Sequence, residues 1–236
     1  MKDFEKQDII RCWGVYVPKE AGEEVTQTLK STWINTGKKE KEFRNLICNR
    51  FNAPYSVACM SGTAALKVAL KTLNIGPGDE VVSTPYTFIA TNTSILEVGA
   101  KPVFADIQYD TLNIDPKSVE EKITNKTKAI MCVHYAGNPV DLDELRKVAK
   151  KHNLPIIEDS AHAMATEYKG NPIGSTGDIA TFSFQCVKIV TCGDGGVITT
   201  TNKDIYEGLK KQVWYGIDRD TKKTDILDPL PAPPDR

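Results

Sequence analysis

Residues 56–83 read SVACMSGTAALKVALKTLNIGPGDEVVS, a stretch in which strand-like and helix-like patterns alternate. Ser56–Met60 has the pattern of a short strand, and SGT at residues 61–63 forms a turn into a predicted helix over Ala64–Leu73. The breaker GPGD then leads into a predicted strand over Glu80–Ser83. This order of strand, glycine turn, helix and strand is typical of an α/β domain.

The same alternation continues on both sides of this stretch. The other predicted helices, where apolar residues recur at helical spacing, are Lys19–Ser31, Lys38–Phe51, Ala90–Val98, Pro116–Lys122 and Leu142–His152. The other predicted strands are Lys101–Ala105, Thr127–Val133 and Pro155–Glu158. The pattern predicts an α/β fold with a mainly parallel sheet and helices on both faces. Such a sheet binds ligands at the carboxyl ends of its strands.

The later part of the chain departs from this rhythm. Three closely spaced extended runs, around Tyr168, over Ile179–Phe184 and over Gly196–Thr200, predict hairpins and at least one antiparallel strand. Past Arg219 the pattern decays, and the last twelve residues hold four prolines. We therefore predict an N-terminal segment over residues 1–35, a large α/β domain over 36–220 and an extended or disordered tail over 221–236.

Charge and cysteine content exclude several classes of protein. Thirty basic residues face 31 acidic ones, and a net charge of -1 offers no basic footprint for nucleic acid and no strong field for a membrane surface. Met1–Gln7 is charged, and no stretch approaches the roughly 18 apolar residues of a membrane span, so we expect a cytoplasmic protein. The six cysteines form no CxxC pair, which predicts reduced, mostly buried thiols and no metal site.

The first motif that carries chemistry is SGTAAL at Ser61–Leu66, a glycine turn between a strand and a helix. Such a turn directs backbone N–H groups and the positive helix end at an anion, and the hydroxyl groups add donors. A phosphate fits this pattern. An ordinary N-cap explains the same residues equally well.

The second motif is IIEDSAH at Ile156–His162, where an apolar strand ends in two acids. Asp159 is placed to pair with a protonated ring nitrogen of a bound cofactor. Such a pair keeps the nitrogen protonated and makes the ring a stronger electron acceptor. The alternative is that Glu158 and Asp159 cap a following helix.

The third motif is TFSFQCVK at Thr181–Lys188, followed by GDGG at Gly193–Gly196. Lys188 follows an apolar strand amid apolar neighbours, and burial favours the neutral amine that attacks an aldehyde. Ser183 offers another hydroxyl to a phosphate. The alternative for Lys188 is a surface lysine beside a hairpin turn, with its apolar stem along the protein.

One cofactor, pyridoxal 5'-phosphate (PLP), needs all three motifs. Its phosphate needs a cradle, its ring nitrogen needs an acid, and its aldehyde needs an amine. The agreement of the three motifs favours a PLP enzyme over their separate alternatives.

The chain resembles the DegT/DnrJ/EryC1/StrS aminotransferases, which are PLP enzymes of fold type I that mostly act on nucleotide-linked keto sugars. The resemblance runs from about Ile34 to Arg219. It is carried by SGTAAL (61–66), GPGDEV (76–81), PYTFIATNTSI (85–95), GAKPVFADI (99–107), VHYAGNPVDLDEL (133–145), IIEDSAHA (156–163), GSTGDIATFSF (174–184), the Lys188 region with GDGG (193–196), and YGIDRD (215–220).

The resemblance implies a role for each residue of a cofactor site. Lys188 would form the Schiff base with PLP, and Asp159 would pair with the pyridine nitrogen. The residues expected to hold the phosphate are Gly62, Thr63 and Ser183. Phe88 would stack on the ring face, and His162 would lie beside the cofactor. Taken alone, Phe88 would instead belong to the core, and His162 would cap or pack. Trp33–Gly37 resembles the segment that borders the substrate pocket.

Two features depart from the family pattern. The family continues for roughly another hundred residues into a small C-terminal domain, about a domain's worth by size. We therefore expect this domain to be missing and the proline-rich end to come from truncation or a frameshift. Cys186 and Cys192 replace Pro or Thr and Gly, with no evident consequence for PLP.

The resemblance implies an aminotransferase that moves an amino group from an amino acid, with glutamate as donor, to a nucleotide-linked keto sugar in amino-sugar biosynthesis. It also implies a homodimer. One alternative is a PLP-dependent sugar dehydratase, but those relatives carry His at the lysine position, so Lys188 favours transamination. The other alternative is a non-catalytic remnant or regulatory domain, since function depends on the completed site.

Overall fold

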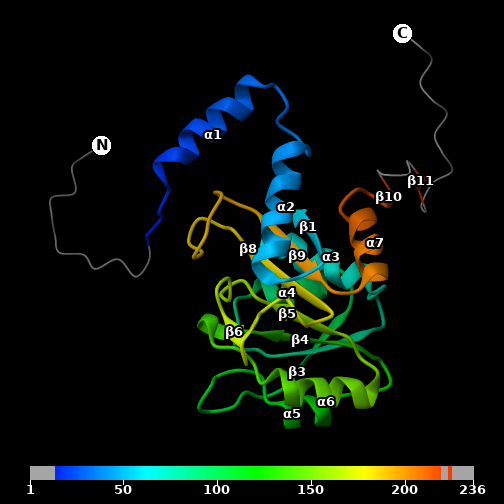
Figure 1. The fold of residues 1–236 in the computed structure, drawn as a ribbon. Helices are drawn as coiled ribbons and strands as arrows, with labels where there is room; N and C mark the ends of the chain where they lie inside the picture. Colours follow the sequence, from blue (N-terminus) through cyan, green and yellow to red (C-terminus); the bar gives the residue numbers. More distant parts are fainter. Residues whose placement is uncertain (1–13, 219–222, 225–236) are drawn as a thin grey trace, which may run out of the picture.

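The computed structural model describes residues 14–218 and 223–224. A seven-stranded sheet crosses the molecule in the order β1-β9-β8-β5-β4-β2-β3 (Figure 1). The bounds of these strands are β1 Tyr55–Cys59, β2 Glu80–Ser83, β3 Lys101–Phe104, β4 Thr127–Val133, β5 Ile156–Asp159, β8 Ile179–Ser183 and β9 Gly196–Thr200. The α/β fold with a mainly parallel sheet is thereby confirmed.

Helices cover both faces of this sheet. The helix bounds are α1 Lys19–Lys30, α2 Lys38–Phe51, α3 Gly62–Thr72, α4 Ala90–Glu97, α5 Pro116–Lys122, α6 Leu142–His152 and α7 Lys203–Gln212, with a 3-10 turn at Tyr135–Gly137. One core cluster lies under α2, α5 and α6, and a second lies under α3, α4 and α7. Two helical layers therefore enclose the sheet, as the sequence predicts.

The strands alternate their side chains between these two cores. In β5, Ile156 belongs to the core under α6, and Ile157 belongs to the core under α3. All four residues of β5 are buried, as is typical of a parallel strand covered on both faces. The strand includes Asp159, one residue beyond the predicted end. Because side chains two apart on a strand share a face, the Asp159 carboxylate lies on the same face as Ile157, the face that carries α3.

The predicted antiparallel strand is β9, which pairs antiparallel with both β8 and β1. At its first residue the backbone comes very close to the turn before α3. A Cβ placed on Gly196 would lie 2.3 Å from the carbonyl oxygen of Ser61. Only glycine fits this contact, which draws the β8–β9 hairpin against the start of α3.

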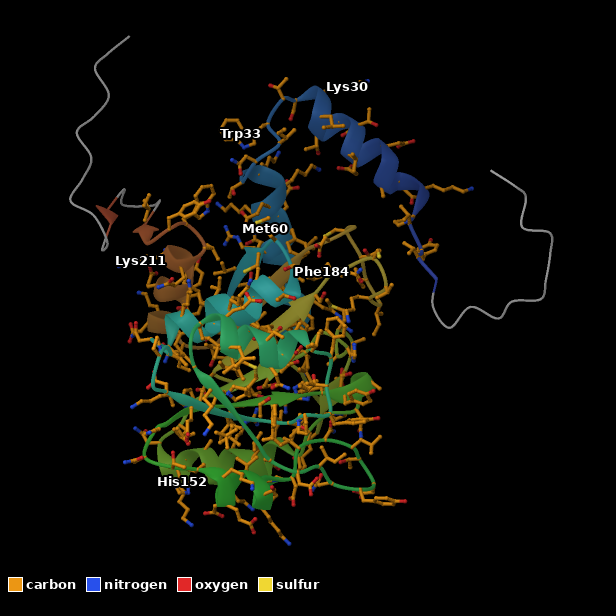
Figure 2. The ribbon with its side chains drawn as sticks, turned by 180° about the vertical axis from the view of Figure 1, so that it is seen from behind. Lys30, Trp33, Met60, His152, Phe184 and Lys211 are labelled. Carbon is orange, nitrogen blue, oxygen red and sulfur yellow. The ribbon has the colours of Figure 1, made fainter. Side chains whose placement is uncertain are left out.

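Helix α1 differs from the rest of the chain because none of its residues is buried. It projects from the body of the protein (Figure 1), and its side chains, including Lys30, point into open space (Figure 2). Two small hairpins, β6 Glu167–Tyr168 with β7 Asn171–Pro172 and β10 Ile217–Asp218 with β11 Lys223–Thr224, complete the described structure. No helix within residues 14–218 or 223–224 has the length and apolarity to cross a bilayer.

Some sequence predictions lie outside the described residues or need correction. The predicted tail over 221–236 lies outside them apart from Lys223–Thr224, and so does Cys12. The described cysteines are free thiols, but only Cys132 is fully buried. The expectation of mostly buried thiols is therefore wrong for this part of the chain, since Cys48 lies on a partly exposed side of α2, Cys59 ends β1, and Cys186 and Cys192 lie on the loop after β8.

Candidate functional site: a pocket at the carboxyl ends of the central strands

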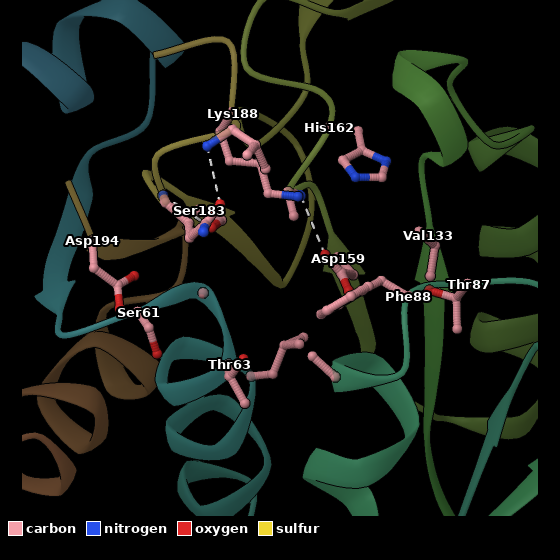
Figure 3. A pocket seen from close by; sticks show the side chains of 16 residues that line it. Ser61, Thr63, Thr87, Phe88, Val133, Asp159, His162, Ser183, Lys188 and Asp194 are labelled. Atoms are coloured by element: carbon pink, nitrogen blue, oxygen red, sulfur yellow. Dashed lines mark hydrogen bonds between the residues drawn. The ribbon is translucent and has the colours of Figure 1, made fainter. Parts of the chain in front are cut away.

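A cavity of about 580 Å³ opens where β4, β5 and β8 end and α3 begins. Figure 3 shows side chains from several elements, among them Lys188, Asp159 and Thr63, arranged around this one space. All seven residues that the sequence nominates for cofactor binding line it, namely Gly62, Thr63, Phe88, Asp159, His162, Ser183 and Lys188. The structure thus brings together residues that lie up to 126 positions apart in the chain, from 62 to 188.

Strand alternation places three of the lining residues. Val133, Asp159 and Ser183 end β4, β5 and β8 on the face that also carries α3. Val133 pairs in register with Asp159, and Asp159 pairs with Thr181, two residues before Ser183. Side chains two apart on a strand share a face, so these three reach the same cavity.

The start of α3 forms the lower wall of the pocket. Ser61 caps the helix, since its Oγ accepts a hydrogen bond from the Ala64 N–H at 3.1 Å. The backbone N–H groups of Gly62 and Thr63 belong to the first turn, where a helix offers them no partner. The ordinary N-cap and the anion cradle are therefore compatible, because Ser61 caps while the next two residues face the cavity.

Ser183 closes this wall from β8. Its side chain is buried, and its Oγ accepts a hydrogen bond from the Gln185 N–H at 3.4 Å. A Cβ placed on Gly62 would lie 2.7 Å from the Ser183 Cβ, so a side chain there would collide with β8. The glycine keeps a hydroxyl group and two helix N–H groups close together, which suits a phosphate.

Asp159 presents a buried carboxylate that is held at both oxygens. Its Oδ2 accepts from the Thr91 hydroxyl at 2.7 Å, and its Oδ1 accepts from the Ala161 N–H at 3.2 Å. Residues 160–166 form turns, so the alternative that Asp159 caps a following helix is wrong. The carboxylate faces the cavity instead.

Lys188 lies on the loop between β8 and β9 and lines the pocket half-buried. The loop is closed at its base, where the Phe184 N–H donates to the Gly195 carbonyl at 2.9 Å. Burial lowers the pKa of the Lys188 amine below the ordinary lysine value of 10.5, and the charge of Asp159 opposes that shift. The direction agrees with the expectation of a readily neutralised amine.

The surroundings of this lysine differ from the expected ones. Its sequence neighbours Ile189 and Val190 are exposed, Ile189 to 70%. The burial of Lys188 therefore comes from the pocket, not from the apolar residues beside it in the sequence. The alternative of a lysine stem along the outer surface does not describe this position, because the residue lines the cavity.

Phe88 and His162 form the side of the pocket away from α3. Phe88 is 67% exposed, so the alternative that it is a core residue is wrong. Its exposed position on the rim of the cavity leaves its face free for a ring to stack on. His162 is half-buried, and burial lowers its pKa below the ordinary 6.5; the charge of Lys188 adds to the shift and Asp159 opposes it.

Sequence reasoning missed several residues of the site. Thr87, Gln185 and Asp194 also line the cavity, and Thr91 contacts Asp159. Thr87 and Thr91 lie within PYTFIATNTSI, which carried part of the resemblance, but nothing in a single sequence joins Thr91 to an acid 68 positions away. Thr87 lies before the first residue of α4, so its four-residue separation from Thr91 is not helical spacing and gave no signal in the sequence.

The second acid of the motif points away from the pocket. Glu158 is fully buried on the opposite face of the sheet, and its Oε2 lies 3.0 Å from His134 Nε2. His134 Nδ1 accepts from the Val140 N–H, so the ring carries its proton on Nε2 and donates it to Glu158. Glu158 is therefore a structural acid that joins the ends of β4 and β5.

The sequence profile of the DegT/DnrJ/EryC1/StrS aminotransferases matches residues 16–227, most of the chain. The chain belongs to this family. The match includes every residue of the pocket, and the fold is that of the large domain of fold type I PLP enzymes. What the resemblance in the sequence implies about fold and family is thereby confirmed.

Relatives of this DegT/DnrJ/EryC1/StrS chain include SpsC of Bacillus subtilis, a spore coat polysaccharide biosynthesis protein, 42% identical over 203 residues, 86% of this chain and 52% of SpsC. Among solved structures, Spr1654 from Streptococcus pneumoniae, named as a sugar aminotransferase and determined in its PLP form, superposes with a TM-score of 0.82 at 37% identity, covering 86% of this chain and 57% of Spr1654.

DesI, determined in the presence of its TDP-sugar product, superposes with a TM-score of 0.79 at 33% identity. That superposition covers 84% of this chain and 50% of DesI. The chain thus spans about half the length of the curated relatives and solved structures that it matches.

Proposed function

We propose that this chain is the cofactor-binding part of a PLP-dependent aminotransferase that passes an amino group from an amino acid to a keto sugar. One observation carries the proposal. A lysine of lowered pKa, a buried carboxylate and a helix start with open N–H groups line a single cavity of about 580 Å³. Membership of the family supports the same assignment.

The residues of the pocket fit PLP in number and in chemistry. The Gly62 and Thr63 N–H groups with the Ser183 hydroxyl would hold the phosphate, in the space that a side chain at Gly62 would fill. The Asp159 carboxylate would accept the proton of the ring nitrogen. Phe88 would cover a ring face, and the Lys188 amine would bind the aldehyde. His162 would lie beside the ring, where its lowered pKa favours the uncharged imidazole.

When bound, PLP supplies an electron-withdrawing ring that stabilises charge on the carbon next to a bound amine. Lys188 would move a proton between the α-carbon of the donor and the cofactor, as a general acid and base. Its lowered pKa serves the first half of this transfer, because the amine must be neutral to accept a proton. Asp159 and the phosphate cradle would hold the orientation throughout.

The substrates belong to the same proposal. We infer a nucleotide-linked keto sugar as acceptor, since DesI was determined in the presence of its TDP-sugar product and SpsC is a spore coat polysaccharide biosynthesis protein. Glutamate as amino donor stays a prediction of the family resemblance. A dehydratase is disfavoured by Lys188 itself, because the dehydratases that resemble this family carry His at that position.

The homodimer and the cytoplasmic location stay predictions. Exposed apolar side chains support a partner subunit, because Ile89, Ile189 and Val190 are exposed and follow the pocket residues Phe88 and Lys188 directly in the sequence. Sedimentation of the purified chain at several concentrations tests the dimer: a mass near 52 kDa, twice the 26.1 kDa of the chain, is expected. A mass of one chain at all concentrations would contradict it.

A single-turnover assay tests the proposed activity. The chain is loaded with PLP and mixed with L-glutamate without a sugar acceptor, and 2-oxoglutarate is measured by a coupled dehydrogenase. One equivalent of 2-oxoglutarate per bound PLP is expected, with D-glutamate as the control that yields none. A chain that binds PLP and releases no 2-oxo acid from any amino acid would instead support the non-catalytic alternative.

A further inference from the structure

Two hydroxyl groups connect Asp159 to the rim of the pocket. Thr87 Oγ1 lies 2.7 Å from Thr91 Oγ1, and Thr91 Oγ1 lies 2.7 Å from Asp159 Oδ2. Thr91 is fully buried in the first turn of α4, whereas Thr87 lines the cavity one residue before Phe88. The three side chains thus form a continuous row from the buried acid to the cavity wall.

The direction of the hydrogen bonds in this row follows from the number of protons. An ionised carboxylate only accepts, and a hydroxyl has one proton to donate. Thr91 spends its proton on Asp159, so the proton between the two threonines must come from Thr87. The row therefore runs from Thr87 to Thr91 to Asp159, and Thr91 has no second arrangement that keeps both bonds.

The row fixes how the carboxylate is turned. Thr91 holds Oδ2, and the Ala161 N–H holds Oδ1 at 3.2 Å from the other side. Rotation of the carboxylate about its Cβ–Cγ bond would break both contacts within a buried site, where lost hydrogen bonds are costly. Thr91 is itself held in place, because its carbonyl accepts from the Ser94 hydroxyl at 2.8 Å.

We propose that Thr91 is a positioning residue, which orients the Asp159 carboxylate toward the ring nitrogen of the cofactor, and that Thr87 secures Thr91. This inference rests on the proposed function, because it assigns the target of Asp159. It goes further in naming two residues, Thr87 before α4 and Thr91 in its first turn, that would set the tilt of the ring in the pocket.

Three variants of the full chain separate positioning from simple packing. Thr91→Val removes the hydroxyl and keeps the shape, Thr91→Ser keeps the hydroxyl, and Thr93→Val is the matched control. Thr93 lies two residues along the same helix, and its hydroxyl donates to the Ile89 carbonyl at 3.1 Å, away from Asp159. Thermal unfolding of each variant establishes that it folds.

Two readouts that need no turnover follow. PLP affinity is measured by absorbance titration, and ring orientation is measured by the circular dichroism that the protein induces in the visible band of bound PLP. We expect Thr91→Val to bind PLP roughly tenfold more weakly, which corresponds to one lost hydrogen bond to a charged acceptor. We also expect it to lose induced dichroism per bound PLP, whereas Thr91→Ser and Thr93→Val keep both.

The outcomes distinguish this inference from the proposed function. If the unaltered chain binds PLP at Lys188 and Thr91→Val matches it in affinity and dichroism, the positioning role is wrong while the proposed function stands. A loss that Thr91→Ser does not restore would assign Thr91 to packing and also overturn the role. If the folded, unaltered chain binds no PLP, the proposed function fails, and the inference falls with it.

Discussion

The two faces of the sheet at the end of β5 carry adjacent acids in different surroundings. Asp159 faces the cavity under α3 and α4, where hydroxyl and amide donors turn it toward open space. Glu158 faces the core under α6, where His134 and Gly177 enclose it and Arg146 lies 4.0 Å away. The two acids that end β5 therefore lie on opposite faces of the sheet, and strand alternation assigns Glu158 to the core and Asp159 to the pocket, where we propose its chemical role.

The largest expected effect lies on the pocket face, at Lys188. Lys188→Ala removes the amine that would bind the cofactor and move the proton, so transamination should fall to background, a loss of at least roughly a thousandfold. The melting temperature should change little, because Lys188 is only half-buried. Lys71→Ala, on the exposed side of α3, is the control. Near-normal turnover of Lys188→Ala would contradict the assignment.

A pair of matched amide substitutions addresses the comparison itself. Asp159→Asn should reduce turnover by roughly a hundredfold, because it removes the carboxylate charge that would pair with the ring nitrogen. Glu158→Gln should leave turnover nearly intact but lower the free energy of unfolding by about 2 kcal/mol, because a buried hydrogen bond to a charged group is weakened. Turnover and urea unfolding are measured on both variants.

The distinction between Asp159 and Glu158 is wrong if the two variants do not differ in this way in turnover and stability. Equal losses of turnover in Asp159→Asn and Glu158→Gln, at unchanged stability, would mean that both acids serve the chemistry. An Asp159→Asn variant that loses stability and keeps activity would reverse the two roles.

Much of this separation follows from the sequence. The side chains of a strand point alternately to the two faces of its sheet, which separates Glu158 from Asp159. The neighbouring strands could be located from their apolar runs. All seven nominated site residues line one cavity. They lie at the ends of strands, at the start of a helix or on the loops that follow strands, and these meet at one edge of a mainly parallel sheet. Their individual roles stay predictions.

What the sequence could not provide are the long-range pairings. The contacts of Thr91 with Asp159 and of His134 with Glu158 join positions 68 and 24 apart, and they depend on the order in which strands assemble. The insertion of β9 between β1 and β8 has the same origin. The exposure of Ile189 beside the half-buried Lys188 shows that local apolarity does not measure burial in a loop.

A smaller effect is expected at the phosphate cradle. Gly62→Ala would place a Cβ 2.7 Å from that of Ser183, so either β8 or the start of α3 must shift. We expect PLP affinity to weaken roughly tenfold, as one or two hydrogen bonds to the charged phosphate lengthen. Fluorescence titration with PLP measures it. Gly22→Ala in α1, where a Cβ meets nothing within 4 Å, is the control; unchanged affinity in Gly62→Ala would place the phosphate elsewhere.

The smallest expected effect is a change in the pKa of His162, which reports whether this imidazole lies near the charge of Lys188 in the pocket. Burial, and then the charge of Lys188, lower the pKa of His162 below 6.5. Lys188→Met removes that positive charge, so the pKa of His162 should rise while staying below 6.5. Nuclear magnetic resonance titration of the imidazole protons in the chain without PLP measures the shift. An unchanged pKa would show that the two side chains do not share the cavity.

The most direct test of the central claim is reduction of the PLP-loaded chain with borohydride, followed by peptide mapping of the modified residue. The visible absorption band of the bound cofactor should disappear on reduction, and the label should be found on Lys188, the lysine that faces Asp159 across the pocket. A folded chain that shows no band, or a label spread over surface lysines, would contradict the claim. Either result would mean that the pocket keeps the residues of the family without its cofactor chemistry.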